Sequence, residues 1–182
     1  MKHHSSGKKV LVFLGLANVI YLLMIFVTIP QVMAFSNGMK LFDLMPAGYS
    51  HAYAVSLLDA LGAEGRSAYL FRQLPLDMFY PILSGIAYCL LAGWLTNKLN
   101  LFDKAVVYLC FLPLVAGLFD YLENFGIIAM ITSYPSLSTM QVAIVSAFSI
   151  IKSVLSVTFF TLLIVLLIVY LVKQSLTALK RT

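Results

Sequence analysis

Four long apolar stretches constrain this chain more than any other feature of its sequence. They cover about residues 10–34, 75–95, 105–131 and 142–172. A helix needs about 20 mostly apolar residues to cross the hydrocarbon core of a bilayer, and each stretch is at least that long. In the whole chain 62% of residues are hydrophobic and 10% are charged, whereas soluble domains are about a quarter charged. We therefore expect an all-α integral membrane protein, with residues 1–182 forming a single four-span transmembrane domain built as a four-helix bundle.

Basic residues are distributed unevenly between the two ends of these stretches. The side that carries both termini holds eight: Lys2, Lys8, Lys9, Lys98, Lys104, Lys173, Lys180 and Arg181. The opposite side holds three: Lys40, Arg66 and Arg72. Cytoplasmic segments of membrane proteins are enriched in Lys and Arg, so we expect a protein of a bacterial inner membrane with both termini in the cytoplasm. The same enrichment explains the net charge of +5, and we expect no nucleic-acid partner.

The segment 36–74 separates the first two apolar stretches and is too long for an unstructured connection in a compact protein. An apolar stripe at helical spacing runs through it: Ala54, Leu57, Leu58 and Leu61. Ser50 is suited to begin this helix and Gly62 to end it. A second short helix over 63–72 is expected to end before Pro75. We therefore predict a short helical cap on the outer side of the bundle.

Charged and amide side chains inside the third and fourth apolar stretches lie at similar depths. Asp120, Glu123 and Asn124 are spaced i, i+3, i+4 and so share one helix face. Glu123 lies about 12 Å, and Lys152 about 14 Å, below the outer ends of their stretches, which permits an ion pair. Asp77 lies nearer the outer surface. Because a charge inside a membrane needs a partner or water, we expect these groups to line a pocket that opens outward.

Residues of the cap and the absence of some motifs complete this interpretation. His51 and Arg66 are expected above the pocket, near its mouth. The sequence contains no HExxH, GxSxG or phosphate-loop motif and no histidine cluster. We expect no cofactor and no metal centre, while carboxylate oxygens remain suited to a hard cation. The alternative is that the polar side chains only hold the helices together.

Several short motifs carry a resemblance to other chains. They are Gly48-Tyr49, the run 57–66, Tyr69, Leu76-Asp77 with Tyr80-Pro81, and the run 120–124. Over about residues 49–124 the chain resembles a group of small, uncharacterised four-span membrane proteins. The resemblance implies the architecture and adds Tyr69 to the candidate residues, and it implies no activity.

Three functions are compatible with these observations. The first is a binding or transport-related protein whose pocket takes a lipid-like ligand, a proton or a cation. The second is a membrane-embedded enzyme that uses Asp120 and Glu123 as acid and base on a lipid-like substrate. The third is an accessory subunit whose polar residues pair with helices of another membrane subunit or of a second copy. We expect membrane lipids as partners, and the pocket hypothesis predicts that Asp120→Asn or Glu123→Gln removes ligand binding while the fold remains.

Overall fold

The chain is helical throughout its regular structure in a computed structural model, which describes residues 7–101 and 105–179. Four of the basic residues counted above lie outside the described residues: Lys2, Lys104, Lys180 and Arg181. The helices are α1 (Gly7–Leu23), α2 (Ile29–Met33), α3 (His51–Ala68), α4 (Leu74–Lys98), α5 (Leu112–Ser133) and α6 (Thr139–Leu179), with 3₁₀ turns at Phe42–Leu44 and Ala105–Phe111. Within the described residues, four helical stretches are long and apolar enough to cross a membrane: Gly7–Met33, His51–Lys98, Tyr108–Ser133 and Thr139–Leu179.

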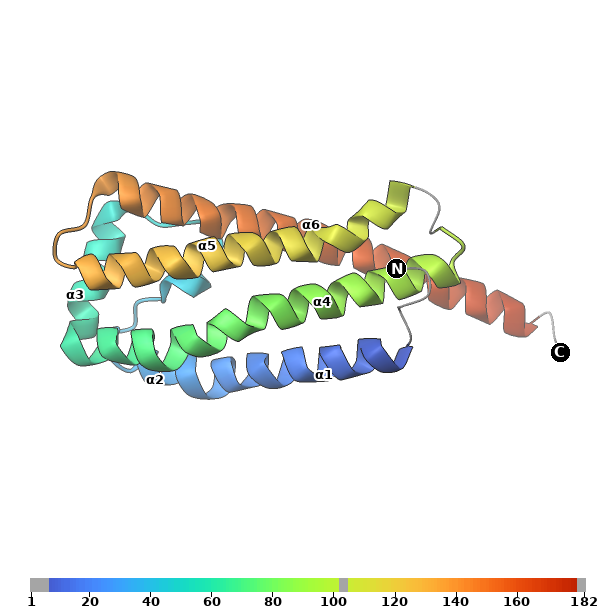
Figure 1. Cartoon of the computed structure of the whole chain (residues 1–182), viewed down its shortest axis with the longest axis horizontal. Helices are drawn as coiled ribbons and strands as arrows, with labels where there is room; N and C mark the ends of the chain where they lie inside the picture. Colours follow the sequence, from blue (N-terminus) through green and yellow to red (C-terminus); the bar gives the residue numbers. More distant parts are fainter. Residues whose placement is uncertain (1–6, 102–104, 180–182) are drawn as a thin grey trace.

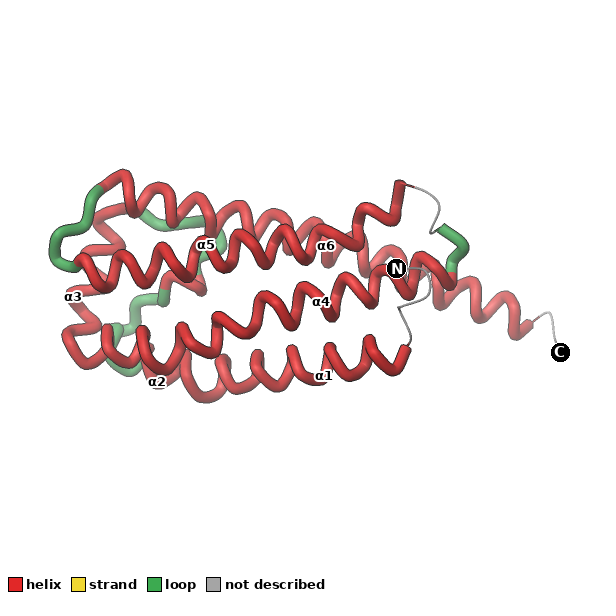
Figure 2. The backbone as a smooth tube through the Cα atoms, in the orientation of Figure 1, coloured by secondary structure: helices red, strands yellow, loops and turns green. Residues whose placement is uncertain are grey.

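The long helices form a row rather than a closed ring. Among the described residues, α1 packs on α4, α4 on α5 and α5 on α6, whereas α1 and α6 hardly touch each other. Helix α3 lies at the end of the bundle opposite to the start of α1 and the end of α6 (Figure 1). Helix α6 has 41 residues, which corresponds to about 60 Å. Its C-terminal part therefore projects beyond the other helices (Figure 2).

Two helical segments continue past a proline because a π-helical turn, which is wider than an α-helical one, precedes it. The π-helical turn Met24–Thr28 joins α1 to α2 before Pro30, and the π-helical turn Tyr69–Gln73 joins α3 to α4 before Pro75. In each turn the amide preceding the proline donates to the carbonyl five residues earlier. A proline ring collides with the carbonyl four residues earlier in a regular helix, and the wider turn relieves that contact. The predicted helix end before Pro75 is therefore wrong.

Helix α3 is capped by Ser50 and bends at Gly62. The Ser50 hydroxyl accepts a backbone hydrogen bond from the first turn at 3.1 Å. Gly62 has φ 59° and ψ −171°, which interrupts the helix. Arg66 donates a hydrogen bond of 2.7 Å to the Leu58 carbonyl across this bend, and its guanidinium lies 4.5 Å from the centre of the Tyr134 ring. Arg66 therefore stabilises the bend.

Two apolar cores hold the bundle together. The core near α3 contains Leu41, Phe42, Leu57, Leu58, Tyr69, Ile127 and Met130. The core toward the other end contains Cys89, Leu95, Cys110, Phe159 and Leu163. Leu41 and Phe42 are fully buried, so the connection 34–50 is folded into the end of the bundle.

Candidate functional site

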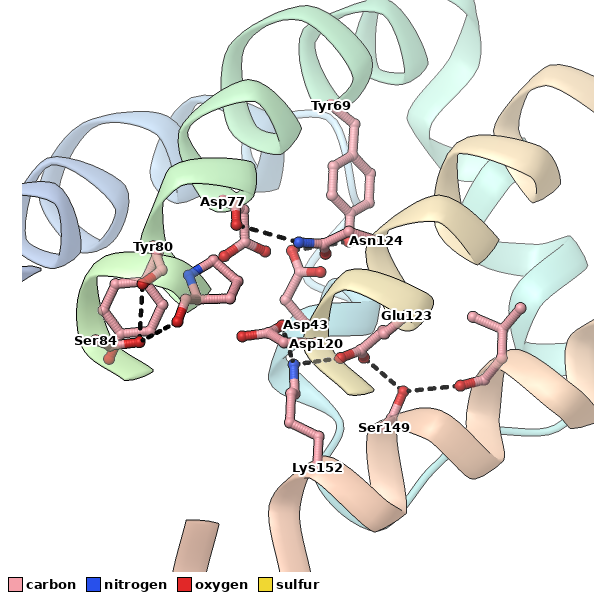
Figure 3. Close-up of polar contacts among 12 residues, drawn as sticks. Asp43, Tyr69, Asp77, Tyr80, Ser84, Asp120, Glu123, Asn124, Ser149 and Lys152 are labelled. Atoms are coloured by element: carbon pink, nitrogen blue, oxygen red, sulfur yellow. Dashed lines mark hydrogen bonds and ion pairs between the residues drawn. The ribbon is translucent and has the colours of Figure 1, made fainter. Parts of the chain in front are cut away.

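Polar side chains from α5 and α6 meet in the interior of the bundle (Figure 3). The Lys152 ammonium on α6 lies 3.0 Å from Oδ1 of Asp120 and forms a second ion pair with Oε2 of Glu123. Ser149, one turn before Lys152, donates a hydrogen bond to Oε1 of Glu123. The ion pair between Lys152 and Glu123 that their similar depth permits is therefore present. One lysine is therefore paired with two carboxylates, and the three side chains face the interior of the bundle.

Asn124 binds α4 at a place where a proline leaves a carbonyl free. Pro81 has no N–H, so the carbonyl of Asp77, four residues earlier, lacks its helical donor. The Asn124 side-chain amide donates to that carbonyl at 3.2 Å. The Tyr121 hydroxyl donates to the neighbouring carbonyl of Met78 at 2.8 Å. Asn124 is fully buried, and its contact holds two helices together.

A cavity of about 390 Å³ lies beside the ion-pair cluster. Its polar wall is formed by Asp43, Asp77, Tyr80, Ser84, Asp120, Lys152, Ser153 and Ser156. Its apolar and aromatic wall includes Tyr21, Met24, Ile25, Tyr88, Val157, Phe159 and Phe160. Glu123 and Asn124 lie behind this lining. The cavity lining therefore combines acidic side chains with aromatic and aliphatic ones.

The cavity opens sideways, between α1 and α6. Helices α4 and α5 form its back wall, while α1 and α6 flank it and hardly touch among the described residues. Three rim residues are exposed: Ile25 at 38%, Val157 at 67% and Phe160 at 40%. The Tyr88 ring packs edge-on against Phe160, with centroids 5.0 Å apart, and closes the end away from α3. In a bilayer such an opening would face the acyl chains.

Asp43 reaches the cavity from the connection 34–50 and was missed by sequence reasoning. Its Oδ2 accepts a hydrogen bond from the Tyr69 hydroxyl at 3.0 Å, and its buried Oδ1 has no partner among the described residues. Burial, followed by the charge of Glu123, raises the pKa of Asp43 from 3.8 to about 7, and Lys152 and Tyr69 oppose this shift. The sequence does contain a local indication that Asp43 is buried, because two apolar residues flank it on each side. A solvated connection rarely has that composition.

The raised pKa of Asp43 predicts a pH-dependent stability. The folded protein binds the proton more tightly than the unfolded chain, so this residue's contribution to stability is greatest below about pH 4 and falls as the pH rises toward about 7. The expected result is that the wild type loses stability between about pH 4 and about pH 8 relative to Asp43→Asn, which does not titrate. Thermal unfolding of both proteins in detergent micelles measures this difference. Parallel pH profiles would contradict the burial of an ionisable Asp43.

The three remaining candidates, His51, Arg66 and Tyr69, lie outside the cavity lining. The His51 ring contacts the Leu137 carbonyl at 3.1 Å, which joins the start of α3 to the connection between α5 and α6. Arg66 lies on the Tyr134 ring, as described above. Tyr69 acts on the cavity through its hydrogen bond to Asp43. The structure therefore brings Asp77, Asp120 and Lys152 to one cavity, and it places the other candidates behind or above it.

Comparisons with known proteins do not assign a function, so the interpretation rests on the geometry of the site. A scan against protein-family models, a search of curated proteins and a search of solved structures found no match to this chain. Among the described residues, no group of three His, Cys, Asp or Glu side chains lies close enough to hold a metal ion. The arrangement suits a ligand with a polar end and an apolar body.

Proposed function

We propose that this is an integral membrane protein that binds an amphipathic, lipid-like molecule in the cavity between α1, α4, α5 and α6. The polar end of the ligand contacts the acidic wall, and its apolar body lies against the aromatic wall and extends through the side opening. The excess of basic residues beside the termini supports an orientation with both termini in the cytoplasm. In that orientation α3 and the connection 34–50 form an outer cap, and the cavity opens into the outer leaflet.

The observation that carries this proposal is the polarity of the cavity. Pockets that bind small molecules are mostly apolar, with a few polar groups that orient the ligand, and this cavity has that composition. A bare proton or metal ion needs no aromatic wall and no volume of about 390 Å³. Binding of an amphipathic molecule therefore explains more of the residues that line the cavity than binding of a bare ion does.

Two other functions have less support from the described residues. An enzyme using Asp120 and Glu123 as acid and base needs both groups at the substrate, but Glu123 lies behind the lining, ion-paired with Lys152. An accessory subunit needs polar groups that face a partner, but Asp120 and Glu123 are 9% and 0% exposed and pair within the chain. We therefore favour binding, and a transport role would build on it.

Filling the cavity tests the proposal. Ser156 lines the cavity and has a small side chain, so Ser156→Trp should exclude the ligand. The expected result is about a tenfold or greater loss of 1:1 binding, since forcing a large side chain and a ligand into one space costs roughly 1–3 kcal/mol. Native mass spectrometry of the full chain in detergent micelles, with dodecylamine, 1-dodecanol and dodecanoic acid as probes, measures this binding.

The matched control places the same side chain on the same helix outside the cavity. Thr158 is exposed on α6 and does not line the cavity, so Thr158→Trp should bind the probes as the wild type does. Failure of all three probes to bind the wild type would overturn the proposal. Equal binding by Ser156→Trp and Thr158→Trp would also overturn it.

A further inference from the structure

We propose that the polar end of the ligand carries a positively charged amine, which binds at the carboxyl groups of Asp77 and Asp43. This inference rests on the proposed function and names the class of molecule that the cavity accepts, namely a cationic amphiphile.

The first argument is the charge balance of the cavity. Lys152 is the only basic side chain in the lining among the described residues, and it is paired with Asp120 and Glu123. Asp43 and Asp77 also line the cavity and have no basic partner there. The lining therefore has two carboxyl groups without a basic partner, and a ligand ammonium would pair with one of them in its ionised form.

The second argument is the state of Asp77. The residue is 4% exposed, and its hydrogen bond to Asn124 uses the backbone carbonyl. The side-chain carboxyl group has no hydrogen bond or ion pair within the part of the chain that the structure describes. Buried polar groups almost always have a partner, because an unpaired one is unfavourable. An ammonium group has three donors and would supply this partner.

The third argument is the aromatic wall beside these carboxyl groups. Tyr80 lies one turn after Asp77 on α4, and its ring is 5.7 Å from that of Tyr21 on α1, which also lines the cavity. Tyr88 and Phe160 continue this surface toward the other end. Aromatic faces attract organic cations as well as apolar chains. An anionic head group such as a phosphate would instead meet Asp43, Asp77 and Asp120, and like charges disfavour binding.

The experiment compares three probes that share one alkyl chain and differ in the charge of the head group. Dodecylamine is cationic, 1-dodecanol is neutral and dodecanoic acid is anionic at neutral pH. The full chain in detergent micelles is titrated with each probe, and 1:1 complexes are quantified by native mass spectrometry. We expect dodecylamine to bind about tenfold or more tightly than 1-dodecanol, since hydrogen bonds between charged groups are about twice as strong as neutral ones. Dodecanoic acid should bind most weakly.

Asp77→Asn should remove the preference for the amine and leave the binding of 1-dodecanol nearly unchanged. Asp59→Asn is the matched control, because Asp59 is exposed on α3 and bonds to Tyr134 far from the lining. A stability measurement of Asp77→Asn confirms that the variant is folded. Asp43→Asn should weaken the same preference and serves as the second variant if Asp77→Asn does not fold.

The outcomes separate the inference from the function on which it rests. Equal binding of the three probes, with loss of all binding in Ser156→Trp, would overturn the cationic ligand and retain the amphipathic one. Preferred binding of dodecanoic acid would also overturn the cationic ligand and retain the amphipathic one. It would indicate that Lys152 binds the head group. A preference for dodecylamine that persists in both Asp77→Asn and Asp43→Asn would overturn the assignment of the carboxyl groups. Absence of binding by all probes would overturn the proposed function itself.

Discussion

Replacing Lys152 by methionine is expected to destabilise the protein by about 3–5 kcal/mol. The substitution keeps an unbranched side chain that is one atom shorter and removes its charge, which leaves Asp120 and Glu123 without a counter-charge. Glu123 is completely buried, and a buried carboxylate that loses its partner carries the full penalty of desolvation. The free energy of unfolding, measured by denaturant titration in detergent micelles, tests this expectation.

Two further variants separate the ion pair from the general effect of changing α6. Lys173→Met alters an exposed lysine on the same helix that donates a 3.3 Å hydrogen bond to the Lys98 carbonyl, and it should change stability by less than about 1 kcal/mol. The double variant Lys152→Met with Glu123→Gln should recover part of the loss, because a neutral amide needs no counter-charge and can still accept from Ser149. A loss below about 1 kcal/mol for Lys152→Met would show that the pair does not stabilise the fold.

The pairing of Lys152 with Glu123 could be predicted from the sequence because it depends on the depth and the helix face of each side chain. Helical geometry fixes both. The rise of 1.5 Å per residue sets the depth of a side chain, and the period of 3.6 sets its face. Two such residues on antiparallel helices are then level, and a charge in an apolar interior has few other partners. The depth argument therefore placed Asp120, Glu123 and Lys152 in one cluster without any knowledge of the packing.

Asp43 and the side opening could not be predicted in the same way, because both depend on long-range packing. Asp43 stands in a connection without a long helical period, and its position follows from the burial of Leu41 and Phe42 against α3 and α5. The opening exists because α1 and α6 are separated by α4 and α5 in the row of helices. The continuity of α3 and α4 was missed because a wide turn before Pro75 overrides the usual break.

Asp120 and Glu123 share one helix face in the sequence pattern, but they occupy different positions in the structure. Asp120 lines the cavity, whereas Glu123 lies behind Lys152 and bonds to Ser149. The expectation that either amide variant removes ligand binding and keeps the fold therefore applies best to Asp120→Asn. Glu123→Gln leaves Lys152 with one carboxylate and removes a buried ion pair, so its first effect should be on stability.

Replacing Gly48 by alanine is expected to destabilise the protein by about 2–4 kcal/mol and to displace Asp43. Gly48 has a φ of +78°, where a side chain costs roughly 1–2 kcal/mol. A Cβ atom there would lie 2.5 Å from Oγ of Ser146 on α6. That hydroxyl accepts the Tyr49 amide hydrogen bond at 2.8 Å, so rotating it away removes a bond of about 1 kcal/mol. The connection 34–50 would then lose its attachment to α6.

Gly38→Ala is the control that isolates this attachment. Gly38 has a φ of +80° in the same connection, but a Cβ atom there would meet nothing within 4 Å. It should therefore show only the backbone strain, roughly 1–2 kcal/mol, while Gly48→Ala adds the contact with α6. If the connection carries Asp43 into the cavity, Gly48→Ala should also lower the affinity for dodecylamine, and Gly38→Ala should leave it unchanged. Equal losses of stability in the two variants would show that the connection is not held on α6, and the position of Asp43 would then depend on Leu41 and Phe42 alone.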